Sequence, residues 1–88
     1  KDGIRTVEDG KLRHRWVAVG NGEIDWMGQF RALVSDGFTG YVSLETHYRK
    51  QQISEAILRL PSGHPFSEGA APATAECLAN WNQMLREL

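Results

Sequence analysis

The stretch that most constrains the fold is residues 37–48, Gly-Phe-Thr-Gly-Tyr-Val-Ser-Leu-Glu-Thr-His-Tyr. It is uncharged until Glu45 and rich in aromatic and aliphatic residues, which predicts a buried β-strand over about 38–45. Because side chains alternate along a strand, Val42 and Leu44 are expected on one face and Glu45 on the other. The face of Glu45 would also carry Tyr41, Ser43 and His47. A carboxylate in an otherwise buried strand costs free energy unless it is paired or bound to a metal, so Glu45 is a candidate functional group.

The composition is that of an ordinary globular domain. The chain has 88 residues, of which 41% are hydrophobic and 24% charged, and its net charge is -1. A charge so close to zero gives no general attraction to nucleic acid or to a membrane surface. No apolar run approaches the roughly 20 residues that a membrane span needs. The single cysteine, Cys77, has no partner for an internal disulfide, which fits the reducing environment of the cytoplasm. We therefore expect a cytoplasmic domain with no membrane partner.

Local signals in the first half of the chain predict a hairpin and a helix. The dipeptide Asp-Gly at 9–10 favours a tight two-residue turn, so we predict a β-hairpin over about 4–19. Residues 20–22 (Gly-Asn-Gly) then form a turn that lets the backbone pass close to another group. Asp25 is a typical N-cap for a helix over about 26–35. The apolar side chains at helical spacing in that helix are Trp26, Phe30 and Leu33.

A helix followed at once by an apolar strand is typical of a parallel α/β sheet. A parallel strand needs a partner earlier in the chain, and the only room for one lies before Lys1. We therefore expect part of a longer protein, in which the apolar faces of the predicted strand would be exposed once its neighbours are missing. Further on, a short helix is predicted over about 53–60 and a final helix over about 73–87. The predicted apolar face of the final helix consists of Leu78, Trp81, Leu85 and Leu88, with Ala75, Cys77 and Met84 beside it.

Three segments in this order carry a family resemblance: Lys1-Asp2, residues 19–25 (Val-Gly-Asn-Gly-Glu-Ile-Asp) and residues 37–45. Together they resemble the C-terminal part of the sugar phosphate isomerase/epimerase family, whose members are xylose isomerase-like TIM barrels. The resemblance implies that residues 1–88 are a single segment that forms the last strand–helix units of a TIM (β/α)8 barrel. The hairpin would be an insertion on the active-site face. A complete barrel takes about 250 residues, so this barrel would be incomplete.

The resemblance also implies a function. Glu45 would bind a divalent metal ion (Mn, Mg, Co or Zn) and would be the base that moves a proton next to a sugar carbonyl. The other metal ligands, a His just before Lys1 and a Glu and an Asp on earlier strands, would lie outside these residues. We therefore expect the parent protein to be an isomerase or epimerase of sugars or sugar phosphates, and the 88 residues alone to be inactive. The expected partners are the sugar, the rest of the barrel upstream of Lys1 and, in a homo-oligomer, further copies of the protein.

Other polar residues are candidates for contact with substrate. His47 shares the predicted face of Glu45 and could support it or touch substrate, or it could simply face solvent. Asp2, at a predicted strand end, and Arg15, in the hairpin, are further candidates for substrate contact. Glu45 itself could instead be half of a surface ion pair, because such carboxylates are common.

The hairpin has a basic character that would suit an anionic ligand. Its cations could bind a sugar phosphate or a nucleic-acid backbone, and they are Arg5, Lys11, Arg13 and Arg15. Glu8 and Asp9 reduce the net positive charge of the hairpin, which favours a hairpin that simply faces solvent over one that binds an anion. Trp16 alone is a weak signal for a nucleic-acid surface, where several aromatic residues usually interleave with basic ones. A nucleic-acid partner is therefore not favoured.

Two other functions remain open from the sequence. The chain could be a stand-alone small α/β protein that binds a partner through exposed sheet edges. It could also be a relative of endonuclease IV, a DNA-repair enzyme of the same fold, which would need several metal ions and a basic groove.

Overall fold

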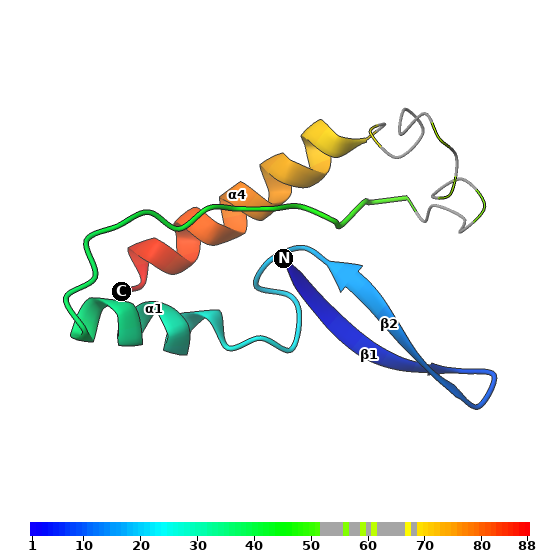
Figure 1. Cartoon of the computed structure of the whole chain (residues 1–88), viewed down its shortest axis with the longest axis horizontal. Coiled ribbons are helices and arrows are strands. Elements are labelled where there is room, and N and C mark those ends of the chain that lie inside the picture. Colours follow the sequence, from blue (N-terminus) through cyan, green and yellow to red (C-terminus); the bar gives the residue numbers. More distant parts are fainter. Residues whose placement is uncertain (52–55, 57–58, 60, 62–66, 68) are drawn as a thin grey trace.

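A computed structural model describes residues 1–51, 56, 59, 61, 67 and 69–88. Most of the short helix predicted over about 53–60 lies outside these residues. The elements with defined bounds are β1 (Asp2–Glu8), β2 (Lys11–Val17), α1 (Trp26–Ser35) and α4 (Ala70–Arg86) (Figure 1). In the described part, the chain is a small α/β structure in which a two-stranded antiparallel sheet is joined to these two helices.

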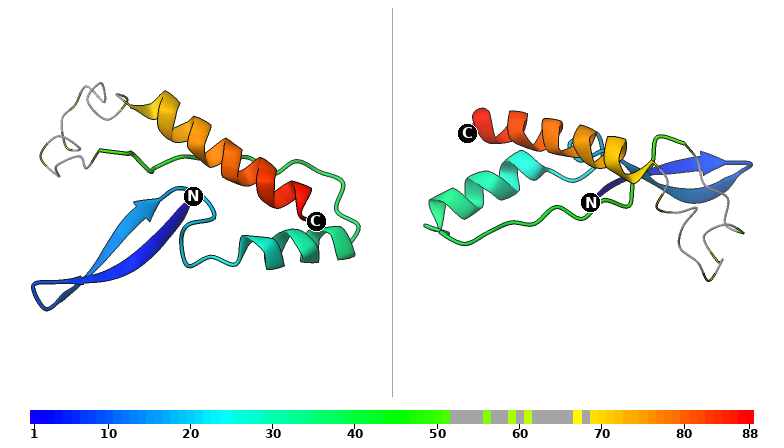
Figure 2. Two further views of the ribbon diagram at one scale, coloured as in Figure 1. Left: turned by 180° about the vertical axis from the view of Figure 1, so that it is seen from behind. Right: turned by 90° about the horizontal axis from the view of Figure 1, so that it is seen from above.

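The hairpin prediction is confirmed, and the hairpin as a whole begins and ends two residues earlier than expected, at Asp2 and Val17. Asp9 has φ 51° and Gly10 has φ 73°, so both turn residues occupy the left-handed region that a two-residue turn of this type requires. The register pairs Glu8 with Lys11 next to the turn and Asp2 with Val17 at the far end. Figures 1 and 2 show that the hairpin projects from one end of the molecule, away from both helices.

Helix α1 has the bounds that the sequence predicts. The side chain of Asp25 caps it, because Oδ1 accepts a hydrogen bond from the backbone N–H of Gly28 at 2.9 Å. Gly37, at φ 72°, follows the end of the helix in the left-handed conformation that glycine adopts most easily. The apolar stripe of this helix is also confirmed. Phe30 is buried, and the flanking Trp26 and Leu33 pack against the core.

An aromatic cluster between α1 and α4 forms the centre of the core. The ring centroids of Phe30 and Trp81 are 4.8 Å apart at an interplanar angle of 78°, and those of Trp26 and Trp81 are 5.7 Å apart. Such edge-on pairs add to the free energy gained from burial alone. The two helices lie side by side, and both run away from the hairpin (Figure 2). Ala18 and Val19 extend the core to the base of β2.

Helix α4 begins and ends slightly earlier than predicted, and its buried face is different from the predicted one. The buried residues are Ala73, Cys77 and Trp81, which are spaced four apart along one stripe. The prediction is wrong for Leu78 and Leu85, which are exposed, and right for Trp81, which is buried. Cys77 and Met84, which were expected beside the predicted face, also belong to or pack against the core. The contact of Trp81 with α1 fixes the rotation of the helix, so the leucines lie to the side of the interface. Neither helix with defined bounds in the described part is long and apolar enough to cross a membrane.

The strand predicted over about 38–45 is wrong for this structure. Residues 38–45 run as an extended but irregular segment past the helices toward the hairpin (Figure 1). Strand propensity depends on neighbours, and within the described residues the sheet contains only β1 and β2, so nothing pairs with this segment. Tyr41 is 99% exposed, whereas Leu44 packs against the core. The described residues therefore give no evidence for a TIM barrel.

Two polar contacts fix the remaining segments to α4. The side-chain amide of Asn80 donates a hydrogen bond to the carbonyl oxygen of Val19 at 2.9 Å, which holds the base of the hairpin. The hydroxyl of Tyr48 donates to Glu76 Oε2 at 3.3 Å, which holds the extended segment. Burial, together with the negative charge of Glu76, raises the pKa of Tyr48, so this hydroxyl remains a donor at neutral pH.

Candidate functional site at the base of the hairpin

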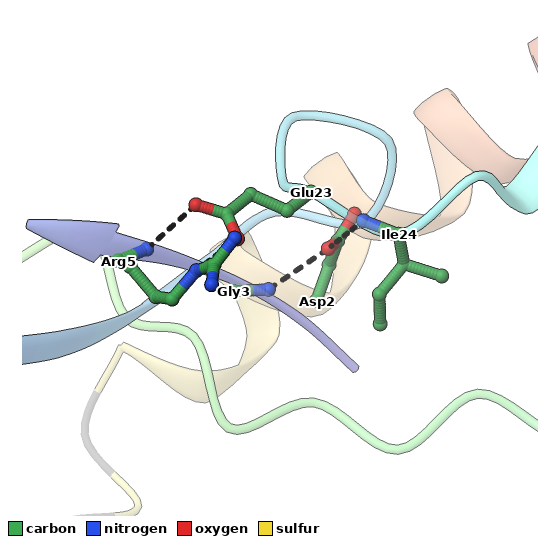
Figure 3. A network of polar contacts seen from close by, with 5 residues as sticks. All are labelled: Asp2, Gly3, Arg5, Glu23 and Ile24. Atoms are coloured by element: carbon green, nitrogen blue, oxygen red, sulfur yellow. Dashed lines mark hydrogen bonds and ion pairs between the residues drawn. The ribbon is translucent and has the colours of Figure 1, made fainter.

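The carboxylate of Asp2 is buried at the start of β1, with only 1% of the residue exposed. Figure 3 shows it between the strand and the loop that follows β2. Its oxygens accept hydrogen bonds from the backbone N–H groups of Gly3 (2.8 Å), Gly20 (3.0 Å), Gly22 (3.1 Å) and Ile24 (3.4 Å), and from the indole N–H of Trp26 (3.1 Å). Both oxygens are therefore occupied within the chain. Asp2 holds the loop in place and offers no exposed atom to a substrate.

The glycine turn at 20–22 has the close approach that the sequence predicts, and the approaching group is the Asp2 carboxylate. A Cβ on Gly22 would collide with Asp2 Oδ1, so this position requires glycine. Gly20 has φ 90°, a conformation that other residues rarely adopt. The turn closes through a hydrogen bond from the N–H of Asn21 to the carbonyl oxygen of Ala18 at 3.0 Å.

Glu23 fastens the same loop to the outer edge of β1 (Figure 3). Its backbone N–H donates to the carbonyl oxygen of Gly3 at 2.9 Å. Its carboxylate accepts from the backbone N–H of Arg5 at 3.0 Å and from Arg5 Nε at 2.8 Å. These hydrogen bonds, the backbone one first, lower the pKa of Glu23. The loop is thus tied to this side of the hairpin through Glu23.

Glu45 lies beside Lys1. The distance from Lys1 Nζ to Glu45 Oε2 is 3.1 Å, and the Glu45 side chain is 68% exposed. The hydrogen bond and the positive charge of Lys1 lower the pKa of Glu45, so the group is a carboxylate at neutral pH. The resemblance leads one to expect Lys1-Asp2 and Glu45 close together. The structure brings Lys1 to Glu45, whereas Asp2 points into the loop.

Two rings complete what we call the Glu45 cluster, which consists of Lys1, Trp16, Glu45 and His47. The ring centroids of Trp16 and His47 are 5.4 Å apart, and Lys1 Nζ lies 5.9 Å from the centroid of the Trp16 ring. Trp16 is 53% exposed and can offer a flat apolar surface next to the carboxylate. The sequence indicated Glu45 and His47 but gave little weight to Trp16. The signal that could have found it is its place at the end of β2, close to the predicted active-site face.

Arg15 lies apart from the Glu45 cluster. Its guanidinium forms an ion pair with Glu8, with 3.1 Å between Nη2 and Oε1. It also lines an open hollow of about 630 Å³ on the hairpin. The other residues around this hollow are Gly3, Ile4, Arg5, His14, Trp16, Glu23 and Ile24. Arg15 and Arg5 are each neutralised by a carboxylate, so the hairpin is less basic than its sequence suggests.

The described residues do not by themselves fit a divalent metal ion. Among them, no group of three or more His, Cys, Asp or Glu side chains is arranged to hold one. The Asp2 oxygens are taken by N–H donors, and the charged group next to Glu45 is the ammonium of Lys1. A metal site that included Glu45 would need its other ligands from elsewhere and would have to displace Lys1.

Replacing Lys1 with Met should raise the pKa of Glu45 toward its ordinary value, because the main cause of its lowered pKa is then removed. Because the folded-state pKa of Glu45 is lowered, the ionised group stabilises the fold at pH values above its unfolded-state pKa. This stabilisation is lost as the pH falls through the folded-state pKa. NMR titration of the side-chain carboxyl measures the shift. The pKa of Glu23 is the internal control, since its partner is Arg5. An ordinary pKa for Glu45 in the unmodified chain would contradict the Lys1 contact.

Comparisons of the chain with protein-family models, with curated proteins and with solved structures return no match. The function of the chain is therefore inferred from the Glu45 cluster and from the hairpin that carries Trp16.

Proposed function

We propose that the chain is the C-terminal part of a xylose isomerase-like barrel that isomerises or epimerises sugars or sugar phosphates, with Glu45 as the carboxylate that transfers the proton. The observation that carries this proposal is the 3.1 Å contact between Lys1 and Glu45. These residues are far apart in the sequence, and the resemblance expects them at the ends of neighbouring barrel strands. Active sites of such barrels lie at the C-terminal ends of the strands.

The extended segment at 38–45 supports the same proposal. Within the described residues it has no strand neighbour, and several of its apolar side chains are exposed, namely Phe38, Tyr41 and Val42. A segment of this kind can become a strand when parallel neighbours are added on both sides. Leu44 already packs against the helical core, on the side that the helices of a barrel would cover.

The proposed chemistry uses Glu45 as a base. Its carboxylate takes the proton from the carbon next to the sugar carbonyl, so that a C–H bond breaks, an O–H bond forms on Glu45, and the electron pair moves into an enediolate. Returning the proton to the former carbonyl carbon, while the hydroxyl proton passes from the oxygen of the first carbon to the former carbonyl oxygen, completes an isomerisation. The ammonium of Lys1, 3.1 Å from Glu45, keeps the base ionised and can stabilise the developing negative charge. No step is assigned to a metal ion, because the described residues do not fit one.

The exposed face of Trp16 would contribute to substrate binding rather than to proton transfer. The less polar face of a sugar ring can lie on an indole while its hydroxyl groups reach the neighbouring carboxylate. In the Glu45 cluster the ammonium of Lys1 and the imidazole of His47 both lie beside the indole.

The test is Glu45→Gln in the natural protein that contains this chain. Transfer of solvent deuterium to the carbon next to the carbonyl of ketoses and ketose phosphates should fall by about 100-fold or more, because general-base catalysis is lost. Glu8→Gln is the matched control, since Glu8 also belongs to an exposed ion pair with 3.1 Å between its charged atoms. Equal exchange rates in the two variants, or no exchange in the unmodified protein, would refute the proposal.

A further inference from the structure

The hairpin has two outer edges, and its register defines which backbone groups face outward on each. In an antiparallel pair, residues alternate between hydrogen-bonded pairs and pairs whose N–H and C=O groups point away from the partner. The two-residue turn makes Glu8 and Lys11 a hydrogen-bonded pair. The groups that point outward from β2 therefore belong to Leu12, His14 and Trp16, and those of β1 belong to Gly3, Arg5 and Val7.

The two edges are not equivalent. Glu23 covers the first part of the β1 edge, since it bonds to the carbonyl oxygen of Gly3 and the N–H of Arg5. Within the described residues, no backbone hydrogen bond joins the outward groups of β2 to another segment. The side chains along β2 are also accessible, with 63% of Leu12 and 53% of Trp16 exposed. As far as the described residues extend, the edge of β2 is therefore open to a further strand.

The two faces of β2 differ in chemistry. One face carries Leu12, His14 and Trp16. Val7 of β1 lies directly opposite Leu12 and is also exposed. The other face carries cations at every second position, namely Lys11, Arg13 and Arg15. Of these, Arg15 is paired with Glu8, whereas Lys11 and Arg13 form no ion pair with any described residue. A strand that lies along β2 would therefore meet two large apolar side chains separated by His14 on one face and a basic row on the other.

We propose that the open edge of β2 binds an extended peptide segment in which acidic and apolar residues alternate. The segment adds to the hairpin as a third strand, and its backbone bonds to the outward groups of Leu12, His14 and Trp16. Its carboxylates face Arg13 and Lys11, and its apolar side chains cover Leu12 and Trp16. This site shares Trp16 with the proposed substrate surface, whereas the strand pairing itself involves none of the groups assigned to proton transfer.

A second copy of the chain fits this edge less well. If two β2 strands paired antiparallel about a two-fold axis at His14, Arg13 of one copy would lie opposite Arg15 of the other, twice in the same interface. Like charges directly opposite each other across a sheet are destabilising. The basic row therefore discriminates against self-pairing and in favour of an acidic partner.

The experiment uses the full chain and a labelled peptide of alternating Glu and Val. Fluorescence anisotropy measures the affinity, and NMR reports which backbone amides shift. We expect binding that shifts the amides of Leu12, His14 and Trp16. Two control peptides carry the same number of residues, one with Lys in place of Glu and one with its Glu and Val residues grouped in two blocks, and neither should bind comparably.

Two variants of β2 and one remote variant test the site. Arg13→Glu should weaken binding by about tenfold or more, because a like charge is placed against the peptide. His14→Pro should also weaken binding by about tenfold or more, because it removes one of the backbone N–H groups that the peptide would bond to. The pairing of β1 with β2 should persist, because this N–H points away from β1 and proline is tolerated at such an edge position. Arg31→Glu, which makes the same charge change on α1, should leave the affinity within about twofold.

Several outcomes would overturn the proposal. Equal binding of the block peptide would show general charge attraction without strand addition, and equal binding of the Lys peptide would remove the role of the basic row. Amide shifts confined to β1, or the absence of binding by the alternating peptide, would exclude the β2 edge. Sedimentation of a dimer that His14→Pro converts to a monomer would identify a second copy as the occupant.

Discussion

Replacing Asp2 with Ala is expected to destabilise the chain by about 3–5 kcal/mol, because each buried donor that loses its acceptor costs about 1–3 kcal/mol where water cannot replace it. Four backbone N–H groups and the indole N–H of Trp26 share this carboxylate. Native domains are stable by only about 5–15 kcal/mol, so a loss of this size leaves little or no margin. We expect the loop that carries Gly20 and Gly22 to detach from β1 in this variant.

Urea denaturation followed by circular dichroism measures this change as a shift of the midpoint at unaltered slope. Asp2→Asn keeps one carbonyl oxygen in the same place and should recover part of the lost stability. Asp36→Ala is the matched control, because Asp36 is exposed at the end of α1 and its loss should change stability by no more than about 0.5 kcal/mol. Equal midpoints for Asp2→Ala and Asp36→Ala would contradict the role given to Asp2.

Replacing Trp81 with Ala is also expected to cost about 3–5 kcal/mol, the usual range for removing a large aromatic side chain from a core. Trp81 is 8% exposed and contacts Phe30 and Trp26 across the interface between α4 and α1. The core of the described chain is small, so the cavity that this substitution leaves cannot be filled by neighbours. The contact between the two helices should therefore be lost with the ring.

The matched control for this prediction is Trp16→Ala, which makes the same truncation at a residue that is half exposed on the hairpin. It should cost less than about 1.5 kcal/mol, because much of its surface is already in water. Thermal unfolding of both variants, monitored through the far-ultraviolet signal of the helices, distinguishes the two positions. A similar loss in both would mean that the aromatic cluster is not the main source of cohesion between α1 and α4.

The hairpin and α1 could be predicted from sequence because the signals that define them are local. Asp9 and Gly10 occupy the left-handed conformations of their turn, and the carboxylate of Asp25 caps the helix three residues on. Each of these effects acts within a few residues and needs no knowledge of the rest of the fold. Whether such a segment forms a strand or a helix is therefore determined by residues within or next to the segment.

The segment at 38–45 and the face of α4 could not be predicted in the same way. Whether an apolar stretch becomes a strand depends on neighbours that lie elsewhere in the chain, and the described residues supply none. The leucines and the Ala73–Cys77–Trp81 stripe of α4 both have helical spacing, so periodicity alone did not decide between them. The contact between the rings of Trp81 and Phe30, which lie far apart in the sequence, determines which face of α4 is buried.

The candidate site was predicted in part. The sequence indicated Glu45 through its unusual position after an apolar stretch, and the turn at 20–22 through its glycines. It did not indicate that Asp2 would be the group that the turn encloses, because every partner of Asp2 except the adjacent Gly3 lies 18 or more residues further along the chain. The role of Trp16 was underestimated for the same reason, since its neighbour His47 comes from the extended segment.

The cover that Glu23 places on β1 has a consequence for fibre growth. A cross-β fibre lengthens only when each unit offers a free edge on both sides, so that one copy can stack on the next without end. Here the first part of one edge, at Gly3 and Arg5, is occupied by the protein's own loop. An exposed hairpin with apolar side chains would ordinarily be a hazard at high concentration. In this chain, copies that met at β2 would present β1 edges shortened by the loop, which disfavours addition of the next copy.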